Sequence, residues 1–201
     1  MACARMSHRS SHRSDKEGGK SSVGRTLLLT GRPGVGKTTV IQKVANPLAD
    51  QAGGFYTQEI RDSAGRRQGF RLVTLDGDEA VLAHTDLRGP EHPQVSRYGV
   101  DAEAVEKVGV KAIREAIASH KVIIVDEIGK MELYCEAFKE AVSEAIQSPS
   151  PVVATIMRGS RPWTDELKAT GRSEVWEVTV DNRDVLPKQV RRWLNVDAKD
   201  K

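Results

Sequence analysis

Short apolar runs alternate with stretches of helical periodicity along most of this chain. Four of the runs have the length of a buried strand: residues 26–30, 121–127, 152–156 and 174–180. Between them, hydrophobic residues recur at spacings of three and four, which predicts helices. The expected helices are residues 37–49, 101–120 with Asp101 as a plausible N-cap, 131–147, 164–169 and a terminal helix reaching Leu194. Apolar strands separated by helices are typical of a mostly parallel sheet flanked by helices, so we expect the α/β class.

One region departs from this alternation. Residues 54–61 and 69–75 have the composition of two strands, and the Ser-Ala-Gly-Arg segment at 63–66 between them has the composition of a turn. We therefore expect an antiparallel hairpin at residues 54–75, inserted into the α/β series.

The first 24 residues have a different composition. They are rich in Ser, His, Arg and Gly and contain no aromatic residue, Leu or Ile. Such a segment cannot bury enough apolar surface to offset the entropy of ordering, so we expect a disordered basic leader. An organelle transit peptide is the alternative, although the apolar face of an amphipathic helix is missing. One domain at residues 25–196 and a polar tail at 197–201 complete the expected organisation.

Charge and cysteine content narrow the class of protein. The formal net charge of the 201 residues is +3, but the first 25 residues hold six basic and two acidic side chains, so the remainder carries one excess acid. A nucleic-acid partner is therefore not expected. Two cysteines far apart in sequence predict neither a disulfide framework nor a cysteine metal site, which fits a reducing, cytoplasmic setting. No apolar run approaches the ~20 residues of a membrane span, so no membrane partner is expected.

A glycine-rich segment follows the first predicted strand. Its sequence, GRPGVGKT at residues 31–38, matches the Walker A pattern G-x-x-x-x-G-K-[ST] in the strand-to-helix context that the pattern requires. Glycine lets consecutive backbone N–H groups converge on phosphate oxygens, and the following helix directs its positive dipole end at them. We expect Lys37 to reach the β and γ phosphates and Thr38 to bind Mg²⁺.

A second motif is VIIVDEIG at residues 122–129, where four apolar residues bring Asp126 and Glu127 to the carboxyl end of a buried strand. Ligands of open α/β sheets bind at that edge. Two adjacent acids there are costly without a cation. We expect Asp126, as a Walker B acid, to hold Mg²⁺ through its water shell, and Glu127 to orient and deprotonate an attacking water. Together the motifs predict a P-loop NTPase fold and catalytic roles for Lys37 and Glu127.

These motifs resemble the small nucleoside-triphosphatases described from thermophiles and, in vertebrates, as cancer-related nucleoside-triphosphatase. The resemblance extends from Leu27 to about Pro187, and the segments 157–171 and 78–93 depart from it. It rests on LLLTGRPGVGKTT, GFYTQEIR, GFRLVTLDG, RYGVD, VIIVDEIGKMEL, VVATI and VTVDNRDVLP.

The resemblance implies a Mg²⁺-dependent enzyme that hydrolyses nucleoside triphosphates, ATP and GTP among them, slowly and with broad base preference. It also implies that both motif regions contact the nucleotide. The residues expected there are Gly31, Arg32, Pro33, Gly34, Val35, Gly36, Lys37, Thr38 and Thr39 in the loop, and Asp126, Glu127, Ile128 and Gly129 in the second motif.

Several further residues have two interpretations each. Thr155 either senses the γ phosphate or the attacking water, or is an ordinary strand residue. Asn182 and Arg183 follow a predicted strand at a place where side chains can meet the base, but Asn182 can equally cap the terminal helix. An arginine that neutralises the γ phosphate would speed the reaction, and the sequence does not choose among Arg32, Arg61, Arg66 and Arg158.

Two other functions use the same phosphate loop. A small-molecule or nucleotide kinase would transfer the γ phosphate to an acceptor hydroxyl, and Glu127 beside Asp126 argues against it. An NTP-gated switch or assembly module would hydrolyse slowly to reset a partner interaction, with the hairpin and the segment after Ile156 as its surfaces. The sequence identifies no protein partner.

Overall fold

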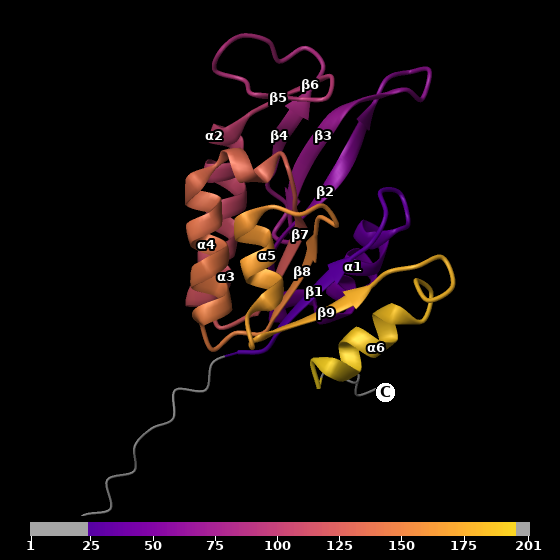
Figure 1. Ribbon diagram of the computed structural model, residues 1–201, viewed down its shortest axis with the longest axis vertical. Coiled ribbons are helices and arrows are strands. Elements are labelled where there is room, and N and C mark those ends of the chain that lie inside the picture. Colours follow the sequence, from indigo (N-terminus) through magenta and orange to yellow (C-terminus); the bar gives the residue numbers. More distant parts are fainter. Residues whose placement is uncertain (1–23, 196–201) are drawn as a thin grey trace, which may run out of the picture.

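The computed structural model describes residues 24–195. Within this range nine strands form one sheet in the order β5-β6-β4-β3-β2-β7-β8-β1-β9 (Figure 1). The strands are β1 (Thr26–Thr30), β2 (Ala52–Arg61), β3 (Arg67–Thr74), β4 (Glu79–His84), β5 (Gln94–Val95), β6 (Tyr98–Val100), β7 (Val122–Ile128), β8 (Val152–Ile156) and β9 (Ser173–Glu177).

Five neighbouring strands, from β2 through β7, β8 and β1 to β9, run parallel. The remaining four pair antiparallel at one end of the sheet. The helices and short helical turns are α1 (Lys37–Ala45), η1 (Asn46–Gln51), α2 (Ala102–Ala104), η2 (Val105–Val110), α3 (Lys111–Ala118), η3 (Glu132–Tyr134), α4 (Glu136–Gln147), α5 (Pro162–Ala169) and α6 (Leu186–Trp193). The predicted α/β class and mostly parallel centre are confirmed.

Both faces of the parallel strands are covered by helices (Figure 1). Successive residues of a strand point to opposite faces, and β7 shows the consequence. Its Ile123 and Val125 pack in the core beneath η2, α3 and α4, whereas Val122 and Ile124 pack in the core beneath α1 and α6. An uninterrupted apolar run is what a strand buried on both faces requires. Because residues 122–125 are buried on both faces, the position of β7 is fixed, and Asp126 and Glu127 in its last part lie at the carboxyl edge of the sheet.

The predicted hairpin is present, with β2 and β3 paired from Phe55 opposite Thr74 to Arg61 opposite Arg67. The first half of β2 also pairs parallel with β7, so the hairpin continues the central sheet and its second half extends beyond the end of β7. Strands β4, β5 and β6 were not predicted. They are short, and β4 is half exposed, so their hydrophobic alternation is weak.

Three predicted helices have different limits in the structure. The first ends at Ala45, because Pro47 restricts the residue before it and η1 takes over. The segment predicted as one helix at 101–120 contains a π-helical turn, η2, between α2 and α3; Asp101 is its N-cap as predicted, accepting from the Ala104 N–H at 2.9 Å. The helix predicted from residue 131 is α4, which starts at Glu136 after the separate turn η3.

Two predicted segments fall on residues that the structure does not describe. The leader, apart from Gly24, and the polar tail at 197–201 lie outside the described residues. Among residues 24–195, the helices are all too short or too polar to span a bilayer.

Candidate active site

The phosphate-binding loop joins the carboxyl end of β1 to the start of α1. Gly34 and Gly36 have φ angles of 75° and 109°, a region that favours glycine, so the loop adopts a backbone that other residues would strain. Helix α1 begins directly after Gly36, at Lys37. Thr38 is half-buried and Thr39 exposed in its first turn. The turn is free of acidic residues, which suits an anion at the positive end of the helix dipole.

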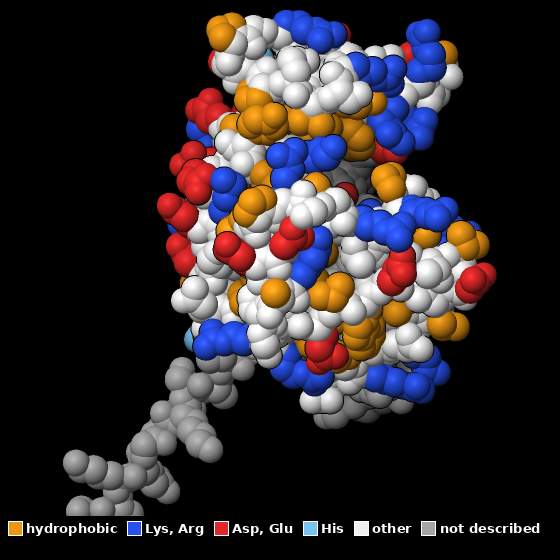
Figure 2. Space-filling model, in the orientation of Figure 1, with side chains coloured by type: hydrophobic (Ala, Val, Ile, Leu, Met, Phe, Trp, Pro, Cys, Tyr) orange, Lys and Arg blue, Asp and Glu red, His pale blue; other side chains and the backbone are white. Residues whose placement is uncertain are grey.

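The side chain of Lys37 crosses from this loop toward the end of β7. It is only 9% exposed, and its Nζ lies 3.7 Å from Oε1 of Glu127. The two sequence motifs therefore meet in space at the carboxyl edge of the sheet. Figure 2 shows a hollow on this face between the β2–β3 part of the molecule and the part around α1, with Lys and Arg side chains on both of its borders.

Asp126 is fully buried at the bottom of this edge. The hydroxyl of Thr155 donates to its Oδ1 at 2.7 Å, and Thr57 donates to Oδ2 through its hydroxyl at 3.2 Å and its backbone N–H at 3.4 Å. A buried carboxylate needs such donors to offset the water that it loses. Its orientation is thereby fixed from β8 on one side and from β2 on the other.

Thr155 thus has a defined contact, which is to the carboxylate of Asp126. It is fully buried in β8. Sequence reasoning did not find Thr57, because a half-exposed strand threonine gives no pattern that distinguishes it. The only signal was its place in the segment GFYTQEIR that carries the family resemblance.

Thr155→Val is expected to weaken Mg²⁺ binding and to cost about 1–3 kcal/mol of unfolding free energy, because it leaves a buried carboxylate oxygen without its shortest donor. The measurements are urea unfolding and the Mg²⁺ dependence of turnover. Thr164→Val is the matched control, since Thr164 is also fully buried and its hydroxyl donates to the Arg161 carbonyl at 3.1 Å, in α5. An unchanged Mg²⁺ dependence in Thr155→Val would contradict the contact's role.

The side chain of Glu127 is 34% exposed and faces Lys37. Burial raises the pKa of its carboxyl above the ordinary value; the Lys37 ammonium opposes this, and Asp126 adds to it. A carboxylate with a raised pKa is a stronger base near neutral pH. Glu127 is thus a carboxyl group with a raised pKa beside the ammonium of Lys37.

The oxygen donors at this edge fit magnesium. Thr38 and Asp126 offer hydroxyl and carboxylate oxygens, the ligand type that Mg²⁺ prefers, and Mg²⁺ commonly binds through one or two protein groups together with waters and substrate phosphates. Among the described residues, no cluster of three His, Cys, Asp or Glu side chains could form an all-protein cage. This donor set suits a metal that arrives with a nucleotide.

A third acid, Glu132, was not found by sequence reasoning. It is 4% exposed, and burial, with smaller contributions from Glu127 and Asp126, raises the pKa of its carboxyl to about 8. Helical periodicity over residues 131–147 places the apolar side at Phe138, Ala141 and Val142. This periodicity therefore predicts that Glu132 faces solvent. The turn η3 interrupts that helix and directs Glu132 inward instead.

The unfolding free energy is expected to fall as pH rises from about 4.5 to about 8, because the unfolded chain releases the Glu132 proton in this window while the folded chain keeps it. Glu132→Gln removes the titrating group and should flatten this part of the profile. Urea unfolding at pH 5 and pH 8 measures the difference. Glu136→Gln, at an exposed position in α4, is the control. Parallel profiles for wild type and Glu132→Gln would show that Glu132 does not titrate in this range.

Asn182 and Arg183 lie in the loop after β9. The Asn182 amide accepts from the Thr179 N–H at 2.8 Å and donates to the Glu177 carbonyl at 2.8 Å, so it closes this loop. Its prediction as the cap of the terminal helix is wrong, because the N-cap of α6 is Val185. Arg183 donates to the carbonyl of Val35 at 3.3 Å, which places it against the phosphate-binding loop.

Other predicted residues occupy defined places. Arg32 and Pro33 are exposed in the loop, Val35 packs against the core beneath α1, and the side chain of Ile128 is buried in the opposite core. Of the candidate arginines, Arg61 pairs with Glu59, Arg66 with Asp62 at 2.8 Å, and Arg158 with Glu177 at 3.9 Å. The geometry does not single out one of these for the γ phosphate.

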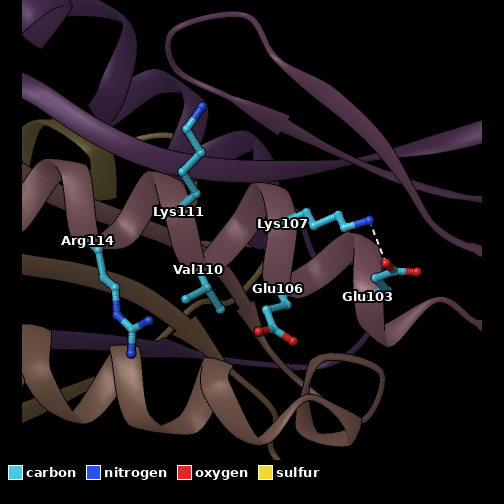
Figure 3. A pocket seen from close by; sticks show the side chains of 6 residues that line it. All are labelled: Glu103, Glu106, Lys107, Val110, Lys111 and Arg114. Atoms are coloured by element: carbon cyan, nitrogen blue, oxygen red, sulfur yellow. Dashed lines mark ion pairs between the residues drawn. The ribbon is translucent and has the colours of Figure 1, made fainter.

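Two surface hollows lie away from this edge. One of about 420 Å³ lies along the continuous helical segment of α2, η2 and α3 (Figure 3), where Lys107 pairs with Glu103. Arg114, which lines the same hollow, pairs with Glu144 of α4 at 3.0 Å. A second, of about 520 Å³, lies over β2, β3 and β4. Neither of these hollows is lined by the phosphate-binding loop or by the acids of β7, whereas Lys37, Asp126 and Glu127 lie together at the sheet edge.

Comparisons with known proteins agree with this geometry. The model of a family described as NTPase matches residues 26–191. The chain is 46% identical to nucleoside-triphosphatase THEP1 of Thermotoga petrophila over 164 residues, covering 82% of this chain and 89% of that protein. It is 39% identical to the protein of the same name from Methanocaldococcus jannaschii over 168 residues, covering 82% and 94%.

Two solved structures share the fold. The crystal structure of THEP1 from Aquifex aeolicus superposes with a TM-score of 0.75 at 34% identity, covering 84% of this chain and 98% of the other. The solution structure of a human cancer-related nucleoside triphosphatase gives 0.74 at 33% identity, covering 88% and 100%. The predicted resemblance is confirmed.

Proposed function

This chain belongs to the nucleoside-triphosphatase family, and on that premise we propose that it hydrolyses nucleoside triphosphates to diphosphates and phosphate with Mg²⁺. The observation that carries the proposal is the 3.7 Å approach of Lys37 and Glu127, beside the buried Asp126. A cation for phosphate and a carboxylate for water thus lie side by side at the carboxyl edge of the sheet.

The loop amides and Lys37 bind the β and γ phosphates and hold the γ phosphorus facing Glu127. Glu127 accepts a proton from a water and orients its oxygen in line with the bond to the leaving diphosphate. Thr38 and Asp126 are the residues that would hold Mg²⁺, which would neutralise negative charge on the phosphates when bound. The P–O bond to water forms as the bridging P–O bond breaks, and the diphosphate leaves.

We propose a slow turnover and a broad base preference as well. The residues that carry the chemistry all act on phosphates, which ATP, GTP, CTP and UTP share. Three of the four arginines considered for the γ phosphate are engaged by acids or loop carbonyls. Without an arginine in place, phosphate-loop enzymes hydrolyse slowly.

The test is phosphate release from ATP, GTP, CTP and UTP with Mg²⁺, with and without candidate acceptor alcohols. We expect release from all four, within about tenfold of one another, lost on chelation of Mg²⁺ and unaffected by acceptors. Diphosphate formed only with an acceptor would identify a kinase. Tight binding without turnover would favour a switch. Release from one nucleotide alone would contradict the broad preference and leave hydrolysis standing.

A further inference from the structure

The buried carboxyl of Glu132 has no part in the mechanism above, yet it lies beside the residue that activates water. The chain turns sharply after β7: the Ile128 carbonyl accepts from the Met157 N–H at 3.0 Å, and the Gly129 carbonyl accepts from the Leu133 N–H at 3.2 Å. The first bond ties the end of β7 to the residue after β8, and the second starts η3 directly after the strand. The turn thereby places Glu132, five residues after Glu127, next to it.

Gly129 shows how closely the two carboxyl groups approach. A Cβ at Gly129 would lie 3.0 Å from Oε2 of Glu132 and 3.3 Å and 3.5 Å from Cγ and Cδ of Glu127. Both acidic side chains therefore pack against the same bare backbone position. Even one methyl group there would force one of them to move by a few tenths of an ångström.

Glu132 is also tied to the backbone of this turn. The backbone N–H groups of Gly129 and of Glu132 itself face its carboxyl and lower its pKa, although burial raises that pKa more. An acid buried among apolar residues is costly unless it is bonded or neutral. Its raised pKa leaves it mostly protonated at pH 7, so it does not add a third negative charge beside Asp126 and Glu127. What remains is a neutral, hydrogen-bonding group at a fixed place.

We propose that Glu132 is a positioning residue, which holds the turn at Gly129 and so fixes the Glu127 carboxyl in the orientation that faces Lys37 and the attacking water. The inference rests on the proposed role of Glu127. A general base must keep its oxygen within hydrogen-bond reach of the water, and displacement by about 1 Å can cost ~10² in rate.

The experiment compares kcat and KM for Mg·ATP in Glu132→Leu, Glu132→Gln and Gly129→Ala. Glu132→Leu should lower kcat about tenfold or more and leave KM within about twofold, because the phosphate-binding loop is untouched. Glu132→Gln, which keeps the shape and a neutral hydrogen-bonding group, should restore most of kcat. Gly129→Ala should lower kcat with KM unchanged. Glu136→Leu, at an exposed position four residues further on, is the matched control and should match wild type.

A double variant separates positioning from general damage. If Glu132 acts through Glu127, then Glu132→Leu should lower kcat no further in a Glu127→Gln background. Additional loss there, wild-type kcat in Glu132→Leu, or equal loss in Glu132→Gln and Glu132→Leu would each overturn the proposal. If Glu132→Leu does not fold, unchanged kcat in Gly129→Ala overturns it. Absence of hydrolysis in both wild type and Glu136→Leu would instead refute the proposed function.

Discussion

Lys37→Ala is expected to abolish turnover and to weaken binding of triphosphate more than binding of diphosphate. The ammonium is almost fully buried beside the phosphate-binding loop, where it is the cation nearest to Glu127 at 3.7 Å. A γ phosphate placed there loses its counter-charge in the variant, while a diphosphate keeps most of its contacts with the loop amides. Removal of one preorganised charge partner commonly costs ~10²–10³ in rate.

The measurements are phosphate release at equal protein concentration and calorimetric titration with Mg·ATP and Mg·ADP. Lys43→Ala is the matched control. Lys43 lies in the same helix as Lys37, but its side chain is half exposed, and its Nζ pairs at 3.9 Å with the exposed Asp184 rather than with Glu127. The control should retain wild-type turnover. Wild-type phosphate release by Lys37→Ala would refute the assignment of the loop.

Glu127→Gln should lower kcat by ~10² or more while Mg·ATP affinity stays near wild type, because an amide keeps the shape of the side chain but cannot accept the proton from water. The variant also leaves the almost fully buried ammonium of Lys37 without its carboxylate partner, so its unfolding free energy is measured beside its activity. The measurements are single-turnover phosphate release and nucleotide titration. Full hydrolysis by this variant would remove Glu127 from the role of base.

Asp126→Asn is the informative comparison, since it alters the metal site rather than the base. The carboxylate held by Thr57 and Thr155 becomes a neutral amide, so Mg²⁺ affinity should fall and raised Mg²⁺ should restore part of the activity. The defect of Glu127→Gln should not respond to Mg²⁺. Identical responses of the two variants would show that the two acids do not have separate roles, and unfolding of both would show that the acids are structural.

The sequence contained enough information to place the phosphate-binding loop and the acids of β7. A short, uninterrupted run of β-branched residues such as 122–125 favours a strand buried on both faces, and its length sets where Asp126 lies. The glycine pattern likewise requires a strand before it and a helix after it. Because both motifs lie at carboxyl ends of parallel strands, their meeting in space followed from the fold class.

Other parts of the site depend on contacts that local patterns do not encode. Thr57 reaches Asp126 because β2 lies beside β7 in a register that puts Phe55 opposite Val125, and that register is set by pairing across the sheet. Glu132 points inward because η3 breaks the helix that periodicity predicts. Strand β4 is half exposed and therefore lacks a clear alternation. In each case tertiary contacts decide between local conformations that the sequence pattern favours equally.

The most direct test of the account is the fate of the water oxygen. Wild-type protein is given Mg·ATP in water labelled with heavy oxygen, under single-turnover conditions, and the products are analysed by mass spectrometry. The account predicts that each inorganic phosphate released carries one heavy oxygen atom, and that Glu127→Gln forms almost none in the same time. Diphosphate without labelled inorganic phosphate, or equal labelling by Glu127→Gln, would contradict hydrolysis by a water that Glu127 activates.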